Sequence, residues 1–180
     1  MRLFAIKAQN KVENNNESGD GCIVNNQYVG CIVYADDIII LSCRIHGLQH
    51  MLNTCYEIAA NLMLVFNCNK SKCITFGPGC KLDISHMYLG ASTIKWCHTI
   101  KYLGVTLLSG PHMKVDIDVI KRKFFASCNT ILSNCNGQTE LVRLSLVESY
   151  CLPILQYCYA AYKLSVVQTK ELNACWNMVY

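Results

Sequence analysis

The stretch that decides the fold runs from residue 29 to residue 41 and reads Val-Gly-Cys-Ile-Val-Tyr-Ala-Asp-Asp-Ile-Ile-Ile-Leu. Two adjacent carboxylates, Asp36 and Asp37, interrupt a run that is otherwise almost wholly apolar. The apolar arms, 29–34 and 38–41, are typical of buried strands, so we predict two strands joined at residues 35–37. Burying a charge is costly unless it is paired or binds a cation. The two aspartates therefore form either a divalent-metal site or an exposed turn, in which Asp is common.

The flanking residues favour the metal site. A surface turn does not need an aromatic residue directly before it and four aliphatic residues directly after it, as found here. Magnesium prefers oxygen ligands and is often held by one or two carboxylates together with substrate phosphates. Two-metal phosphoryl-transfer sites use such groups to clamp the attacking and leaving oxygens. They usually need a third carboxylate from another element.

Length and composition set wider bounds. The 180 residues suffice for one domain with a sizeable core, or for a domain and a half. Only 16% of the residues are charged, against about 25% in typical soluble domains. We therefore expect part of the surface to meet a partner, or the chain to be part of a larger protein. The net charge of +4 permits nucleic-acid binding without requiring it. Residues 121–123 form the only tight basic cluster.

The cysteines indicate a reduced protein. Their number, thirteen, is odd, no Cys-x-x-Cys pair exists, and most lie in apolar runs, where thiols pack as small hydrophobes. The apolar part of residues 1–7 is too short for a signal peptide, and no apolar run approaches the roughly 20 residues that cross a bilayer. We expect an intracellular protein, cytoplasmic or nuclear and not secreted. A zinc site assembled from Cys68, Cys73 and either His86 or Cys97-His98 fits no standard finger spacing.

The rest of the chain predicts an α+β region followed by helices. Residues 10–20 are polar and predict a loop, and residues 22–24 and 27–29 predict a short hairpin. Ser42 is a candidate N-cap for an amphipathic helix whose apolar stripe runs from Ile45 to Leu62. Further strands are predicted at 62–66, 73–76, 93–96 and 102–105, and helices at 116–132, 141–162 (kinked at Pro153) and 166–180.

Several segments of the chain together resemble one known protein family. The sequence Tyr34-Ala35-Asp36-Asp37 is similar to the catalytic motif of reverse transcriptases, in the form found in non-LTR (LINE-type) retrotransposons. Other segments resemble the same family in the same order: 21–24, 38–42, 48–55, 66–73 with the core Phe-Asn-x-x-Lys-Ser, 101–105, 123–126 and 149–155. The resemblance covers most of residues 19–180. It implies an α+β fold with a polar leader at 1–20, a partial polymerase palm at 21–108 and a helical, thumb-like region at 109–180.

The resemblance also implies roles for individual residues. Asp36 would bind Mg²⁺ directly, with Mn²⁺ as the alternative ion, and Asp37 would be a second or supporting carboxylate. Lys70 would lie near the incoming triphosphate, where the alternative is a solvated turn lysine. The remaining residues would contact nucleic acid: Tyr34 and Ala35, Tyr102, Leu103 and Gly104, and Lys121, Arg122 and Lys123. The alternatives are a packed strand aromatic for Tyr34, a short core strand for residues 102–104 and a solvated helix face for residues 121–123. The partners would be an RNA template, a DNA primer and a deoxynucleoside triphosphate, with no membrane.

The chain departs from the family pattern upstream of the motif. Reverse transcriptases need another metal-binding aspartate on a separate strand, and the acids before Asp36 are Glu13, Glu17 and Asp20, in a polar segment. We therefore expect a polymerase fragment that lacks its N-terminal part and is inactive alone. Two alternatives are a non-catalytic nucleic-acid-binding remnant and an unrelated α+β interaction protein whose aspartates form only a turn.

Overall fold

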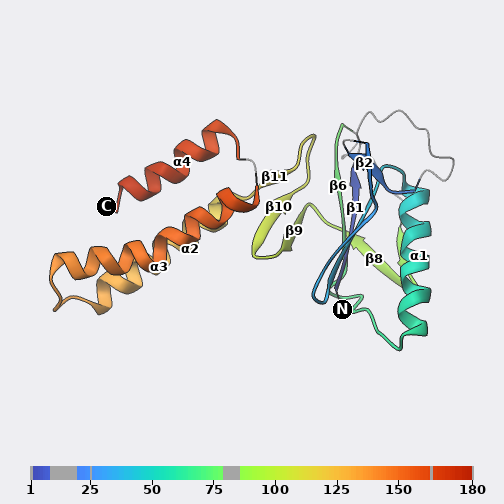
Figure 1. Cartoon of the computed structure of the whole chain (residues 1–180), viewed down its shortest axis with the longest axis horizontal. Coiled ribbons are helices and arrows are strands. Elements are labelled where there is room, and N and C mark those ends of the chain that lie inside the picture. The colour runs from blue at the N-terminus through green and yellow to red at the C-terminus, as the bar shows by residue number, and fades with distance from the viewer. Residues whose placement is uncertain (1, 9–19, 25, 79–85, 163, 180) are drawn as a thin grey trace. The chain divides into compact units, whose positions relative to one another are not determined.

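The computed structural model describes residues 2–8, 20–24, 26–78, 86–162 and 164–179. It is a mixed α+β structure that divides into two compact units. The first unit contains residues up to Ile100 together with Leu107–Lys114, and the second contains Lys101–Thr106 and Val115 onward. The first unit is built around a sheet with one long helix, and the second consists mainly of helices (Figure 1).

A six-stranded sheet forms the framework of the first unit, with the strand order β4-β5-β1-β6-β8-β7. The strands are β1 (Arg2–Ala8), β4 (Cys31–Tyr34), β5 (Asp37–Ser42), β6 (Lys72–Phe76), β7 (Met87–Leu89) and β8 (Ser92–Trp96). The sheet is mixed: β4 and β5 pair antiparallel, whereas β1 is parallel to both of its neighbours, β5 and β6. The connection from β5 to β6 is thus a helical crossover, and strand β1 lies between these two strands in the sheet.

Strand β1 lies at the centre of this sheet, although the sequence analysis assigned its residues to a polar leader. Its residues Arg2–Lys7 pair with β5 on one side, and its residues Phe4–Ala8 pair with β6 on the other. The expected loop at 10–20 lies outside the described residues except for Asp20. The expected hairpin at 22–29 is confirmed, because β2 (Cys22–Val24) pairs antiparallel with β3 (Gln27–Val29).

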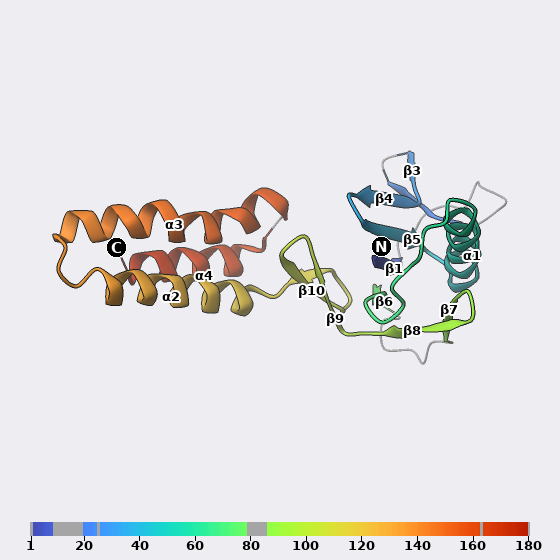
Figure 2. The same ribbon diagram turned by 90° about the horizontal axis from the view of Figure 1, so that it is seen from below.

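Helix α1 (Ile45–Asn61) covers one face of this sheet (Figure 2). Its apolar stripe, centred on Leu48 and Leu52, packs with sheet residues such as Ile40, Cys73 and Ile94 in one core cluster. The predicted stripe is right except at Leu62, which is 64% exposed beyond the helix end. The predicted cap is also displaced, since Arg44 is the N-cap residue and Ser42 is the last residue of β5. The Ser42 hydroxyl instead accepts a hydrogen bond from the Arg44 main-chain N–H.

Two predicted strands are wrong. Residues 62–66 form no strand, and Met63 and Val65 are 92% and 81% exposed. Residues 102–105 turn a hairpin between β9 (Thr99–Tyr102) and β10 (Val105–Leu108), because Leu103 and Gly104 both have positive φ. These strands and β11 (Lys114–Val115) form a three-stranded sheet in the order β11-β10-β9. The strand predicted at 93–96 is confirmed as β8.

The second unit contains three helices: α2 (Ile117–Asn134), α3 (Glu140–Ala161) and α4 (Val166–Asn177). These confirm the predicted helices, and Pro153 lies inside α3. Helix α2 lies beside α3 and also contacts α4 (Figure 2). The stripe of α2 is buried at Ile117, Ile120, Phe124 and Cys128, and the Phe124 ring lies 6.4 Å from that of Trp176. The described residues contain no helix that is both long and apolar enough to cross a membrane.

Candidate functional site

The two aspartates lie at a tight hairpin turn between β4 and β5. Tyr34 and Asp37 are paired residues at the ends of the two strands, so Ala35 and Asp36 form a two-residue loop. Such loops need a positive φ at their first central residue, and Ala35 has a φ of +51°. Asp36 is exposed at the turn, whereas Asp37 is only 3% exposed as the first residue of β5. The hairpin thus presents one solvent-facing carboxylate beside one buried carboxylate.

The two arms of the hairpin differ in burial, which corrects one prediction. Strand β5 is mostly buried, but all four residues of β4 are exposed. The reason is position: β4 is the edge strand of the sheet, whereas β5 lies between β4 and β1 under helix α1. Tyr34 is 60% exposed at the end of β4. It is therefore accessible to a ligand and does not have the alternative role of a packed strand aromatic.

Lys70 lies in a turn at the same end of the sheet as the aspartates. Its main-chain N–H donates to the Asn67 main-chain oxygen at 3.1 Å and to the Asn67 side-chain oxygen at 3.1 Å. The strand register places Asp37 level with Arg2, and Lys72 level with Phe4. The parallel strands β5 and β6 therefore begin at the same end of the sheet. Since one strand separates β5 from β6, their main chains are about 10 Å apart. Lys70 itself is exposed.

The strand between these two segments brings no carboxylate. Strand β1 has the sequence Arg-Leu-Phe-Ala-Ile-Lys-Ala. Glu13 and Glu17 lie outside the described residues, and Asp20 contacts His50, with 2.6 Å between carboxylate oxygen and ring nitrogen. Within the described ranges, no group of three or more His, Cys, Asp or Glu residues is placed to hold a metal ion. The candidate zinc ligands among Cys68, Cys73, His86, Cys97 and His98 therefore do not form such a group.

In the second unit, Tyr102 is the last residue of β9, and Leu103 and Gly104 form the hairpin turn that follows it. Tyr102 is 8% exposed, Leu103 is 38% exposed, and the Leu103 carbonyl accepts a hydrogen bond from the Tyr157 hydroxyl at 2.7 Å. A Cβ atom added at Gly104 would lie 3.6 Å from the Tyr157 ring. Tyr157, a residue of α3 that sequence analysis did not single out, thus supports this turn. No local signal marks it, since the contact spans 54 residues.

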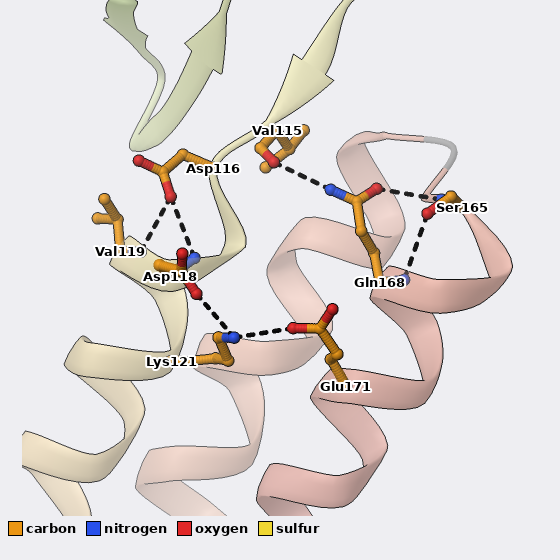
Figure 3. A network of polar contacts seen from close by, with 8 residues as sticks. All are labelled: Val115, Asp116, Asp118, Val119, Lys121, Ser165, Gln168 and Glu171. Atoms are coloured by element: carbon orange, nitrogen blue, oxygen red, sulfur yellow. Dashed lines mark hydrogen bonds and ion pairs between the residues drawn. The ribbon is translucent and has the colours of Figure 1, made fainter.

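The basic cluster on α2 is only partly available to a ligand. Lys121 lies 2.7 Å from the Asp118 carboxylate and 2.8 Å from the Glu171 carboxylate of α4 (Figure 3). Its hydrogen bonds to Asp118 and Glu171 raise the Lys121 pKa above its ordinary value. Because both neighbouring carboxylates already bind this ammonium, Lys121 is a poor phosphate ligand. Arg122 and Lys123 are exposed on the same helix.

The ion pair belongs to a polar network that joins the start of α2 to the start of α4 (Figure 3). Asp116 caps α2 by accepting from the main-chain N–H groups of Asp118 and Val119. Ser165 and Gln168 form a capping box at α4, and the Gln168 amide also donates to the Val115 main-chain oxygen at 3.0 Å. Lys121 therefore has a structural role in this unit.

Comparison with known families identifies the chain. Residues 7–107 match the family model described as reverse transcriptase (RNA-dependent DNA polymerase), which covers more than half of the sequence. The chain belongs to the reverse transcriptase family. Neither a curated protein nor a solved structure gives a match. The matched residues include the Asp36-Asp37 hairpin, helix α1 and the Lys70 turn, together with strands β5 and β6, which pair with β1 on either side.

The cysteines of this reverse transcriptase domain and of the helical unit are free wherever they are described. In the domain, the Cys22 and Cys43 sulfur atoms lie 3.4 Å apart as a thiol–thiol hydrogen bond. Burial, and next the hydrogen bond to Cys43, raise the pKa of Cys22 to about 12. Burial likewise raises the pKa of Cys73 to about 12. Such thiols remain protonated at neutral pH, so they pack as apolar groups in the domain.

Proposed function

We propose that this chain is part of a reverse transcriptase of the non-LTR (LINE-type) class, with a partial palm at 21–108 and a thumb-like region at 109–180. The observation that carries the proposal is the tight hairpin with Asp36 exposed and Asp37 buried at its turn. The family match supports nucleotidyl transfer as the reaction class. The substrates would be an RNA template, a DNA primer and deoxynucleoside triphosphates.

The donor set at the hairpin fits a hard cation. Asp36 and Asp37 are adjacent carboxylates, and a carboxylate-rich, oxygen-only set suits Mg²⁺, or Mn²⁺ in its place. The ion would polarise the phosphate oxygens of the nucleotide and lower the charge that develops during transfer. Asp36, the exposed residue, would be the direct ligand, and Asp37 would support it from the start of β5.

The remaining proposed site residues have distinct positions. Lys70 would contact the triphosphate from its turn, which lies at the same end of the sheet as the two aspartates. The small Ala35 would let nucleic acid approach the turn, with exposed Tyr34 beside it. The Tyr102-Leu103-Gly104 turn would support the primer strand. Arg122 and Lys123 would contact duplex phosphates, whereas Lys121 would do so only after losing its two carboxylate partners.

We further propose that the chain does not polymerise DNA by itself. A two-metal centre needs carboxylates from more than one element, and β1, which occupies the position beside β5, contains no acid. With two protein carboxylates, most of the ligands of a magnesium ion would be water, so binding would be weak. The complementary carboxylate and the grip on template and nucleotide would come from an N-terminal part of the same polymerase. The protein would act inside the cell, in the nucleus or cytoplasm.

Binding and primer extension together test this proposal. We expect the chain to bind a labelled RNA–DNA template–primer in fluorescence anisotropy, and Mg²⁺ to strengthen that binding through Asp36. The Asp36→Ala variant should lose the magnesium effect, whereas the matched variant Glu57→Ala, which removes an exposed acid of α1, should keep it. Failure to bind the duplex at all would refute the proposed family role for this chain.

Primer extension on an RNA template addresses activity directly. We expect no template-dependent product from the chain alone in the presence of Mg²⁺. Synthesis that Asp36→Ala abolishes would show that the two carboxylates suffice and would overturn the proposed inactivity. The second candidate function, a non-catalytic nucleic-acid-binding remnant, is favoured by the absence of acids in β1. It predicts duplex binding that neither Mg²⁺ nor Asp36→Ala changes.

A further inference from the structure

Strand β4 leaves one side of the six-stranded sheet open. It is the first strand in the order β4-β5-β1-β6-β8-β7, and all four of its residues are exposed. The side chains of Ile32, Val33 and Tyr34 are 44%, 63% and 60% exposed. An edge strand with apolar side chains is a template on which another chain can pair.

The hydrogen-bond pattern fixes which main-chain groups face outward. The Leu41 N–H donates to the Gly30 carbonyl at 2.8 Å, so these residues form a hydrogen-bonded pair at the end of the ladder. Hydrogen-bonded and non-bonded pairs alternate along an antiparallel ladder. Ile32 and Tyr34 therefore bond to β5, and the N–H and C=O groups of Cys31 and Val33 point away from it. The edge offers two donors and two acceptors.

Nothing in this strand protects the edge. Natural edge strands commonly carry lysine, proline or a bulge that discourages pairing. Residues 22–35 contain no charged residue and no proline, and the β4–β5 register runs without a bulge from Cys31↔Ile40 to Tyr34↔Asp37. The uncharged, β-branched segment therefore has no electrostatic barrier against an identical segment.

We propose that a second copy of this chain pairs with β4 in antiparallel orientation. One register uses all the outward-pointing N–H and C=O groups of Cys31 and Val33. It places Cys31 opposite Val33 of the second copy, and the two Ile32 residues opposite each other. It forms four main-chain hydrogen bonds around a two-fold axis through Ile32. Cross-strand pairs of β-branched side chains add to this. This inference does not depend on the proposed polymerase role.

The charges select the antiparallel orientation. In a parallel pair, the Asp36 carboxylates of the two copies would lie side by side, and like charges directly opposite each other are destabilising. In the antiparallel register, Tyr34 lies opposite Gly30 of the second copy. The turn with Asp36 then faces residues 27–29 of that copy, which are uncharged. The two acidic turns therefore lie at opposite ends of the paired strands.

The size of the edge sets the expected strength. Four strand residues and the neighbouring Tyr28, which is 57% exposed, bury less than the roughly 1,200 Å² of a standard interface. We expect a dissociation constant in the range of about 1–100 μM. An isologous pair uses the edge of both copies and closes as a dimer, so the association stops at two chains.

Sedimentation velocity of the full chain over a concentration series tests the proposal. We expect a monomer well below about 1 μM and a dimer fraction that grows as the concentration rises through the expected range of about 1–100 μM. Val33→Lys places a charge on the edge, where lysine discourages pairing, and should keep the chain monomeric throughout. Val65→Lys is the matched control, because Val65 is 81% exposed but lies outside the strands; it should dimerise like the unmodified chain.

A second variant separates edge pairing from misfolding. Val33→Pro deletes an N–H group that points away from β5, so the ladder within the chain stays intact while two of the four intermolecular bonds are lost, one from each copy. It should weaken dimerisation at least tenfold with an unchanged far-ultraviolet circular dichroism spectrum. A chain that stays monomeric at all concentrations, or one whose association neither Val33 variant weakens, overturns the proposal.

Discussion

The hydroxyl of Tyr157, on helix α3, donates a 2.7 Å hydrogen bond to the main-chain oxygen of Leu103. Leu103 has a φ of +44° and Gly104 a φ of +81°, as the two central residues of a tight hairpin loop require. A positive φ is unfavourable for leucine. The contact therefore fixes a turn that local preferences alone do not favour, and it joins this turn to the helices of the second unit.

Replacing Tyr157 with Phe should destabilise the second unit. The change removes one hydrogen bond and leaves the ring that lies near Gly104. Because Tyr157 is 53% exposed, we expect a loss near the lower end of about 0.5–1.5 kcal/mol, measured by urea denaturation. Tyr150→Phe on the same helix removes a hydroxyl from a residue that is 68% exposed. Equal losses for the two variants would contradict the role of Tyr157.

Ala35→Gly should stabilise the hairpin that carries the two aspartates. Ala35 has a φ of +51° and is exposed, and L-residues other than glycine pay about 1–2 kcal/mol for the left-handed conformation. Part of this gain is lost because glycine is more flexible in the unfolded chain. We expect a net gain of about 0.5–1 kcal/mol in urea denaturation.

A matched substitution elsewhere in the first unit gives the opposite sign. Ala60 is exposed in the last turn of helix α1, where glycine costs up to about 1 kcal/mol relative to alanine, the cost in a helix interior. Ala60→Gly should therefore destabilise the chain while Ala35→Gly stabilises it. Destabilisation by both variants would show that the positive φ at Ala35 carries no strain.

Much of the fold follows from local sequence signals. The helices of the second unit are predicted because Ile117, Ile120, Phe124 and Cys128 recur at helical spacing, and all four are buried. The Asp36-Asp37 turn is predicted because two polar residues divide an apolar run, and the register confirms the pairing of the arms. The family itself is predicted from the ordered motifs, since the matched range of 7–107 includes most of them.

The errors arise where tertiary context decides. The parallel pairings of strand β1 with β5 and β6 join residues far apart in the sequence, so no local signal places residues 2–8 in the sheet rather than in the expected leader. Residues 62–66 are apolar enough for a strand but form none, because the Leu64 N–H bonds back to the Ala59 carbonyl at the end of α1. The burial of β4 was predicted from its composition, whereas its edge position exposes it. Nor does the sequence reveal that Lys121 is bound by Asp118 and Glu171.

Thiol reactivity should follow burial. With a pKa of about 12 for Cys22 and Cys73, only about one molecule in ten thousand carries the reactive thiolate at pH 8. Cys31 is exposed on β4. In dilute folded protein, iodoacetamide followed by peptide mass spectrometry should label Cys31 well before Cys22 or Cys73. Labelling in urea should remove the difference. Early labelling of Cys73 in the folded chain would contradict the burial of the strand β6 thiol.

The ion pairs of Lys121 should make a pH-dependent contribution to stability. Hydrogen bonds to Asp118 and Glu171 raise the Lys121 pKa above its ordinary value of 10.5, and the hydrogen bond and charge of Lys121 lower the Asp118 pKa below 3.8. The contribution from a raised lysine pKa is present below the unfolded pKa and is lost as the pH rises through the folded pKa. The contribution from a lowered aspartate pKa is present above the unfolded pKa and is lost as the pH falls through the folded pKa.

Lys121→Met should therefore lower the thermal midpoint of unfolding by a few degrees at most, because exposed ion pairs contribute little to stability. The decrease should be constant between about pH 5 and pH 9, where all three groups keep their charges. The difference from the unmodified chain should shrink as the pH falls well below 3.8, because the Asp118 carboxylate, whose pKa Lys121 lowers, then becomes protonated. High salt should also reduce it, since ions screen exposed charges. Lys123→Met provides the control, because Lys123 is exposed on the same helix. A Lys121→Met difference that persists unchanged at pH 2 would show that packing of the lysine stem, and not its charge, holds α4 against α2.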